Sequence, residues 1–125
     1  MIVRALLVVA ARTVAGYALA RHADAGACSQ ALSDSYRVDG KAVAERLREH
    51  CRGGDDLASA AAVLARGPRA AEAQALARQA TRREPDNARA WLGLAFALRA
   101  SDPAGARRAQ ARATALNPYA ATVAP

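Results

Sequence analysis

The stretch "PDNARAWLGLAFAL", from Pro85 to Leu98, decides the fold that we predict for this chain of 125 residues. It opens with Asp86 and Asn87, which favour a helix start because their side chains and charge suit the free N–H groups of a first turn. Four apolar residues then follow at the spacing i, i+3, i+4 and i+7, namely Trp91, Leu94, Ala95 and Leu98. This spacing puts them on one face of a helix, and that face needs another element to pack against.

The same apolar spacing occurs 34 residues earlier, so the chain contains an internal repeat. Leu57 and Leu64 correspond to Trp91 and Leu98, with Ala60 and Ala61 between them. Asp55 and Asp56 precede them and indicate a helix start, as Asp86 and Asn87 do in the second unit. A second helix follows in each unit, after turn signals at Gly67-Pro68 and at Asp102-Pro103. The apolar residues of this second helix match at an offset of 33, which pairs Ala73, Leu76 and Ala80 with Ala106, Ala109 and Ala113. Pro85, after the helix, pairs with Pro118 at the same offset. A period of this length made of two helices predicts stacked helical hairpins.

The downstream unit resembles the tetratricopeptide repeat, a helix-turn-helix unit of 34 residues. The match rests on the apolar residues Trp91, Leu94 and Leu98, the small residues Ala95, Ala106 and Ala113, and the closing Leu116 and Pro118. The upstream unit is more degenerate, because Arg83 stands where its partner has Leu116. It keeps Leu57, Ala61, Leu64, Ala73 and Ala80. The resemblance implies an all-α fold of antiparallel hairpins, a fragment of a right-handed solenoid. Gln110 departs from it by standing where the second helix usually carries an aromatic residue.

Members of this family generally act as interaction scaffolds and bind peptides in a groove lined by the first helix of each unit. In the downstream unit the resemblance assigns that groove to Arg89, Leu92, Phe96 and Arg99. Two arginines beside two apolar side chains would suit an acidic or C-terminal carboxylate segment with an apolar anchor. The upstream equivalents, Asp55, Ala58, Ala62 and Ala65, offer little. The alternative is that all these positions form an ordinary solvated surface.

Two repeat units are fewer than the three that usually make an independent solenoid. The segment Lys41–Cys51 is predicted to be a helix that caps the pair, with Ala44, Leu47 and Cys51 facing inward. The remaining burial would come from this helix, from self-association, or from a partner stacked on the open end.

The first twenty residues, "MIVRALLVVAARTVAGYALA", are apolar except for Arg4 and Arg12. We expect residues 1–22 to form a single-pass membrane anchor, with Arg12 contacting a membrane partner and the C-terminal module in the periplasm or at the cell exterior. A signal peptide cleaved after Ala18-Leu19-Ala20 is a second interpretation. A soluble core helix is a third, since a central arginine costs roughly 2.5–3.5 kcal/mol on insertion.

Cys28 and Cys51 are the two cysteines of the chain. In an exported protein they predict one disulfide, which closes a loop of about 23 residues and contributes ~3 kcal/mol. Buried free thiols are an alternative. A metal site with His22 and His50 is another, although the spacings do not match common zinc ligand pairs. A lipid-modified Cys28 is disfavoured because polar residues separate it from the apolar stretch.

The composition narrows the function classes. The hydrophobic fraction of 53% is largely alanine, which favours helices, and aromatic residues make up only 4%. The net charge of +7 comes almost entirely from arginine, so a soluble module that binds nucleic acid or another polyanion is the alternative function. The arginines are dispersed and lack interleaved aromatic residues, which makes nucleic acid a poor candidate.

The sequence contains no nucleophile elbow, phosphate loop or metal-binding helix motif. We therefore expect no enzymatic activity and no cofactor. Our interpretation is a non-catalytic scaffold for protein partners in a membrane complex. Its predicted parts are residues 1–22 (anchor or signal segment), 23–53 (connecting segment with the capping helix), 54–118 (two hairpins) and 119–125 (tail).

Overall fold

A computed structural model describes residues 2–37 and 41–119, except for the side chains of residues 2–15 and of Arg21. This part of the chain forms six helices and no strand, which confirms the predicted all-α class. The helices are α1 (Ile2–Ser35), α2 (Lys41–His50), α3 (Gly54–Leu64), α4 (Ala70–Arg83), α5 (Ala88–Leu98) and α6 (Pro103–Leu116).

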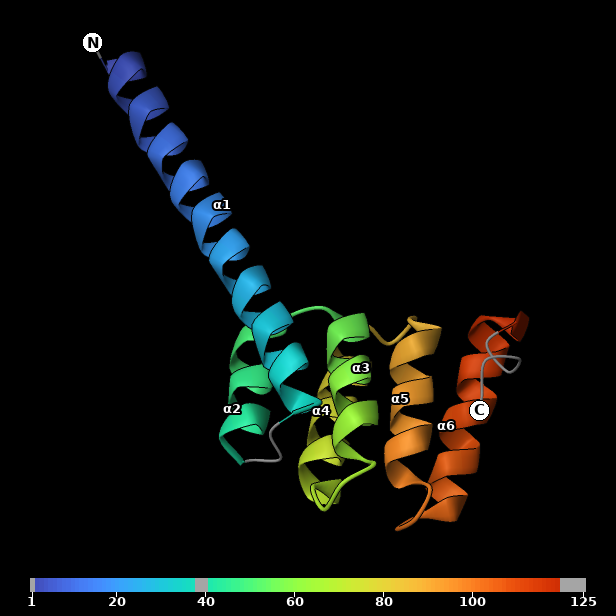
Figure 1. Cartoon of the computed structure of the whole chain (residues 1–125). Helices are drawn as coiled ribbons and strands as arrows, with labels where there is room; N and C mark the ends of the chain where they lie inside the picture. Colours follow the sequence, from blue (N-terminus) through green and yellow to red (C-terminus); the bar gives the residue numbers. More distant parts are fainter. Residues whose placement is uncertain (1, 38–40, 120–125) are drawn as a thin grey trace.

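Helices α2 to α6 lie side by side (Figure 1). The C-terminal part of α1 packs on α2, and the N-terminal end of α1 points away from the other helices. The pairs α3/α4 and α5/α6 are antiparallel hairpins. Helix α5 packs against both α3 and α4, so the second hairpin stacks on the first.

The core is built largely from alanine, as the composition predicts. Its largest fully buried side chains are Leu47, Leu57, Leu76, Val43 and Cys51. Most of the predicted packing positions are buried, namely Leu57, Ala61, Leu64, Ala73, Ala80, Leu94, Leu98, Ala106 and Ala113. Trp91 and Ala95 are half-buried and pack against this core. Leu116 is half-buried and Pro118 is exposed, so packing weakens at the end of the second hairpin.

The two hairpins approach each other closely at Gly93 in α5. This glycine is buried, and a Cβ atom placed on it would lie 2.9 Å from the Cβ and 3.0 Å from the Cα of Ala58 in α3. A contact this short leaves no room for any side chain at position 93. The small residues of the repeat therefore bring the backbones of α3 and α5 together.

The predicted helix-start signals are confirmed at two helices. The Asn87 Oδ1 atom accepts a hydrogen bond of 2.9 Å from the Arg89 backbone N–H at the start of α5. Asp55 and Asp56 lie in the first turn of α3, where negative charge complements the helix dipole. Helix α6 begins in the same way, because the Asp102 side chain accepts from the backbone N–H of Gly105.

The N-cap residue of α3, Gly53, provides no side-chain hydrogen bond, and a residue distant in the sequence caps the helix instead. Glu84, between α4 and α5, accepts a hydrogen bond of 2.6 Å from the Gly54 backbone N–H through Oε1. Its other oxygen, Oε2, accepts from the Asn87 side-chain amide at 2.6 Å. One carboxylate thus joins the start of α3 to the start of α5, a role that the sequence pattern did not indicate.

Replacing Glu84 with alanine is expected to lower the free energy of unfolding by about 1–2 kcal/mol, because the buried Gly54 N–H loses its acceptor. Denaturant unfolding followed by circular dichroism measures this change. Asp86→Ala is the matched control, since the Asp86 side chain is 88% exposed and its ion pair with Arg112, at 3.6 Å, lies at the solvated surface. Equal effects of the two substitutions would contradict the capping role of Glu84.

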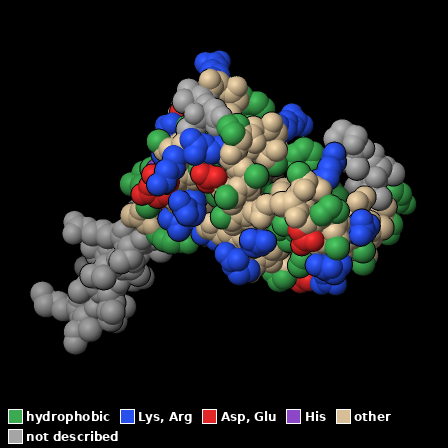
Figure 2. Space-filling model, turned by 90° about the horizontal axis from the view of Figure 1, so that it is seen from below, with side chains coloured by type: hydrophobic (Ala, Val, Ile, Leu, Met, Phe, Trp, Pro, Cys, Tyr) green, Lys and Arg blue, Asp and Glu red, His purple; other side chains and the backbone are tan. Residues whose placement is uncertain are grey.

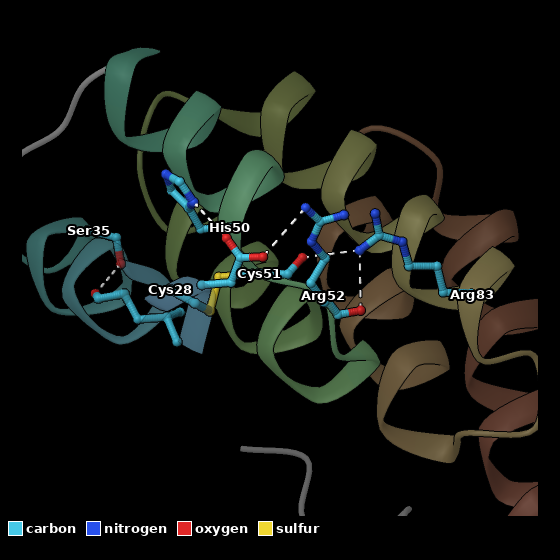
Figure 3. The surroundings of a disulfide bond; sticks show 8 residues. Cys28, Ser35, His50, Cys51, Arg52 and Arg83 are labelled. Atoms are coloured by element: carbon cyan, nitrogen blue, oxygen red, sulfur yellow. Dashed lines mark hydrogen bonds and ion pairs between the residues drawn. A yellow bond between two sulfur atoms is a disulfide. The ribbon is translucent and has the colours of Figure 1, made fainter. Parts of the chain in front are cut away.

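The predicted disulfide is present. Cys28 in α1 is bonded to Cys51, with their Cα atoms 4.8 Å apart and both residues buried (Figure 3). The sulfur atoms are therefore bonded to each other, and neither the free-thiol nor the metal-ligand interpretation describes this structure. Beside the bridge, the Asp24 carboxylate lies 3.5 Å from His50 Nδ1 and 3.6 Å from Arg52 Nη2.

Arg83 connects the disulfide region to the hairpins. Its Nη1 atom donates to the backbone carbonyl oxygens of Cys51, at 3.1 Å, and of Arg52, at 3.2 Å (Figure 3). In the repeat alignment Arg83 stands at the position of Leu116, so it looked like a defect of the first unit. The structure shows that this arginine satisfies the backbone between α2 and α3 instead.

The predicted single-pass membrane localisation, with an extracytoplasmic module, is wrong. Within the part of the chain that the structure describes, no helix combines the length and the apolar character that a membrane span requires. Helices α2 to α6 have 10 to 14 residues, against about 20 for a span. The described side chains of α1 include the polar His22, Asp24 and Gln30. The predicted contact of Arg12 with a membrane partner lies outside the described side chains.

The boundary that we placed between residues 22 and 23 falls inside a helix, because α1 runs without a break from Ile2 to Ser35. Much of the predicted connecting segment therefore belongs to the same helix as the apolar stretch. The predicted boundary after residue 53 coincides with the start of α3 at Gly54, and the one after residue 118 lies two residues beyond the end of α6 at Leu116.

Candidate functional site

A groove of about 510 Å³ runs between α3, α5 and α6. Helix α5 contributes its middle, where Leu92 and Phe96 lie one helical turn apart and are both half-buried. Small residues surround them, with Ala58 on α3, Ala95 on α5 and Ala106 on α6. Because these neighbours are small, the two larger apolar side chains are the main contact surface of the groove.

The four residues that the resemblance assigned to a groove all line this one. Arg89 and Arg99 stand near the two ends of α5, and Leu92 and Phe96 stand between them. They come together because positions i, i+3, i+7 and i+10 share one face of a helix. The structure thus brings the predicted residues to one concave surface, and their role in binding stays a prediction.

The upstream equivalents are divided. Asp55, Ala58 and Ala62 line the groove from α3, whereas Ala65 does not. Asp55 contributes more than the sequence suggested, because its carboxylate lies 3.5 Å from Arg89 Nη1 and accepts from the Asn87 side chain at 2.8 Å. Both members of the Asp55–Arg89 pair are more than half exposed, so the pair adds little stability.

The rim of the groove is strongly basic. Four arginines line it, and Asp55 is the one acidic residue among the lining side chains; the arginines are Arg66, Arg89, Arg99 and Arg107. Two of the guanidinium groups lie over the Phe96 ring, with Cζ at 4.9 Å (Arg99) and 6.0 Å (Arg66) from the ring centroid. Such cation–π contacts place positive charge directly beside the apolar anchor.

Sequence reasoning missed the part of the groove that α6 and the end of α3 supply. Pro103, Ala106, Arg107 and Gln110 line it at the spacing i, i+3, i+4 and i+7 on α6. That spacing is visible in the sequence and marks one helix face. The resemblance places the groove on the first helix of each unit alone, so it does not point to this face of α6.

The described residues that line the groove include neither histidine nor cysteine, and the one carboxylate among them, that of Asp55, lies against Arg89 and Asn87. The lining side chains therefore present an apolar centre and cationic ends to whatever enters.

Comparisons with protein-family models, with curated proteins and with solved structures find no match to this chain.

Proposed function

We propose that this chain is a non-catalytic protein-interaction module, built from two hairpins of tetratricopeptide type, that binds an acidic segment of another protein in the α3–α5–α6 groove. The observation that carries the proposal is the joint exposure of Leu92 and Phe96 between arginines at the floor of a 510 Å³ groove. The repeat offsets and the stacking of α5 on α3 and α4 support the tetratricopeptide type.

The two apolar side chains supply the driving force for such binding. Leu92 and Phe96 keep part of their surface in water, while the neighbouring residues Leu94 and Leu98 on the opposite side of α5 are buried. Full burial of one large apolar side chain contributes about 1.5–3 kcal/mol. Arginines at the rim would add specificity for carboxylates, because a guanidinium group can form two parallel hydrogen bonds with one carboxylate.

The distribution of charge favours a protein segment over a nucleic acid. Figure 2 shows Lys and Arg side chains scattered over the face in view, with Asp and Glu among them, and no continuous basic stripe. Several arginines outside the groove lie within ion-pair distance of carboxylates, as in Arg46–Asp34, Arg52–Asp24, Arg108–Asp102 and Arg112–Asp86. Paired and dispersed cations are a poor surface for a phosphate backbone.

Selection of short peptides from a display library on the purified chain tests the proposal. We expect the selected peptides to carry Asp or Glu near a large apolar residue and to compete with one another. Leu92→Ser is expected to weaken their binding at least tenfold, because it removes an apolar anchor from the groove. Leu19→Ser is the matched control, since Leu19 is 71% exposed on α1 and lies outside the groove.

Binding that survives Leu92→Ser and Phe96→Ser unchanged would overturn the proposal, provided that both variants keep the helical content of the parent chain. Selected peptides rich in Lys or Arg would also contradict it, because they cannot complement a rim with four arginines. Fluorescence anisotropy with labelled peptides measures each affinity.

A further inference from the structure

The second hairpin, α5 and α6, has an open face that corresponds to the face of α3 and α4 on which α5 packs. Helix α5 lies against both α3 and α4. Because α5 and α6 repeat α3 and α4 at offsets of 34 and 33 residues, they present the corresponding face to the outside. Within residues 41–119, α6 has α5 as its one helical neighbour. The groove extends over the open side of α5 and α6, and α3 forms its remaining wall.

Equivalent positions on the covered and the open face differ in burial. Ala58 in α3 is 6% exposed, and its equivalent in α5, Leu92, is half-buried. Ala77 in α4 is fully buried, and its equivalent in α6, Gln110, is exposed. A helix placed on α5 and α6, in the way that α5 lies on α3 and α4, would cover both positions.

The charge at one end of this face is reversed with respect to the covered face. At the start of α5, the Asn87 side chain donates to Asp55 of α3 at 2.8 Å. The equivalent of Asp55 on the open face is Arg89. The end of a covering helix would therefore meet a cation where α5 meets a carboxylate. An acidic residue there would share Arg89 with Asp55, whose carboxylate lies 3.5 Å from Arg89 Nη1.

The other end of the face also gains a cation. Gln74 of α4 donates to the hydroxyl of Ser101, in the turn after α5, at 2.7 Å. The equivalent of Gln74 is Arg107, which is exposed and lines the groove near Arg99 at the end of α5. The two residues that make these contacts with α5 and its following turn, Asp55 and Gln74, thus both correspond to arginines on the open face. A complementary helix needs carboxylates near both of its ends.

The shape of the face fits a helix. The face follows α5 and α6, and α5 has 11 residues, which corresponds to roughly 16 Å. Ala95 and Ala106 are small and let a neighbouring backbone approach, while Leu92 and Phe96 form an i, i+4 ridge that packs into the groove of a second helix.

We infer that the occupant of the groove is an acidic amphipathic helix of a different protein, which packs along α5 and α6 as an added helix. This inference rests on the proposed function and specifies its ligand. A second copy of this chain is the poorer occupant, because the chain carries a net charge of +7 and the groove itself is basic.

Three synthetic peptides of about 16 residues test the inference. The first has a leucine stripe at helical spacing and Glu near both ends; the second has Lys in place of Glu; the third has the composition of the first with two central prolines, which prevent a helix. By fluorescence anisotropy at low salt, the first peptide is expected to bind at least tenfold more tightly than either of the others. It is also expected to gain helical circular dichroism on binding.

A charge-reversal variant of the protein tests whether these arginines select the acidic peptide. The double variant Arg89→Glu, Arg107→Glu is expected to prefer the Lys peptide over the Glu peptide, which inverts the order seen with the parent chain. The matched control is Arg78→Glu, Arg82→Glu, which makes the same change on α4 outside the groove and is expected to keep the parent order. Thermal unfolding checks that both variants are folded.

The outcomes separate this inference from the proposed function. Equal binding of the proline peptide, with loss in Leu92→Ser, would overturn the helical occupant and leave the groove as an interaction site. Sedimentation that shows dimers of the parent chain and monomers of Leu92→Ser would identify a second copy as the occupant and overturn the acidic partner. Failure of all three peptides, or an unchanged preference in the Arg89→Glu, Arg107→Glu variant, would also overturn the inference.

Discussion

Replacing Gly93 with leucine is expected to lower the free energy of unfolding by about 3 kcal/mol, one of the two largest effects that we predict. A side chain at this position meets the Cβ and Cα atoms of Ala58 at 2.9 and 3.0 Å, so α3 and α5 have to separate. This separation opens the alanine-rich interface between the hairpins. Small side chains gain van der Waals energy there only when the two helices are in close contact. Denaturant unfolding monitored by circular dichroism measures the change.

Gly26→Leu is the matched control for this prediction. A Cβ atom on Gly26 in α1 would meet nothing within 4 Å, so the same substitution there creates no clash. Replacing a helical glycine also removes its entropic cost, so Gly26→Leu is expected to be neutral or to stabilise by about 0.5–1 kcal/mol. A Gly93→Leu variant as stable as the parent chain would show that the hairpins are not in close contact at this point.

The second large effect concerns the Cys28–Cys51 bridge. Replacing both cysteines with alanine is expected to cost about 3 kcal/mol, because the bridge closes a loop between residues 23 positions apart in the sequence. The bridge also joins α1 to the end of α2, so limited proteolysis is expected to cut the segment between these helices faster in the double variant.

Adding a reductant separates the stability that comes from the disulfide bond from the stability that comes from packing of the two cysteine side chains. The parent chain is expected to lose stability when dithiothreitol is added, and the Cys28→Ala, Cys51→Ala variant is expected to be insensitive to it. If the parent chain has the same unfolding midpoint with and without reductant, the disulfide makes no contribution. Mass analysis after alkylation reports whether the bond was reduced in each sample.

The parts of the fold that depend on local pattern could be predicted from the sequence. The helix starts at Asn87 and at Asp55-Asp56, the inward face of the Lys41 helix and the burial of the small repeat residues all follow from spacing and side-chain chemistry. Each of these features is set by neighbours within about four residues, where helix geometry fixes which side chains share a face.

The parts that depend on long-range contacts could not be predicted. Glu84 caps a helix that begins 30 residues earlier, and Arg83 satisfies carbonyl groups 31 and 32 residues away. Neither pairing has a sequence signature, because each depends on how α4 and α5 are placed relative to α3. In the sequence Arg83 is only a departure from the repeat, a charge at the position where the second unit has Leu116.

The candidate site was predicted in part. The four α5 residues came from a family resemblance, and the structure gathers them in one groove. The contributions of Arg107 and Gln110 require knowledge of which side of α6 stays uncovered. The contribution of Arg66 requires knowledge of how the end of α3 lies against Phe96 of α5. The error about the membrane arose from reading the first twenty residues alone, whereas α1 continues into a polar segment that ends at Ser35.

The double role of Glu84 also bears on how the molecule melts. One carboxylate holds the first turn of α3 and the turn before α5, so neither hairpin can unravel without disturbing the start of the other. Hydrogen exchange should therefore report similar protection for the amides in the middle of α3 and α5, and heating should produce one sharp transition for both hairpins. A chain cut before Glu84 would keep every residue of α3 and α4 and still lose the acceptor that α3 needs at its first turn.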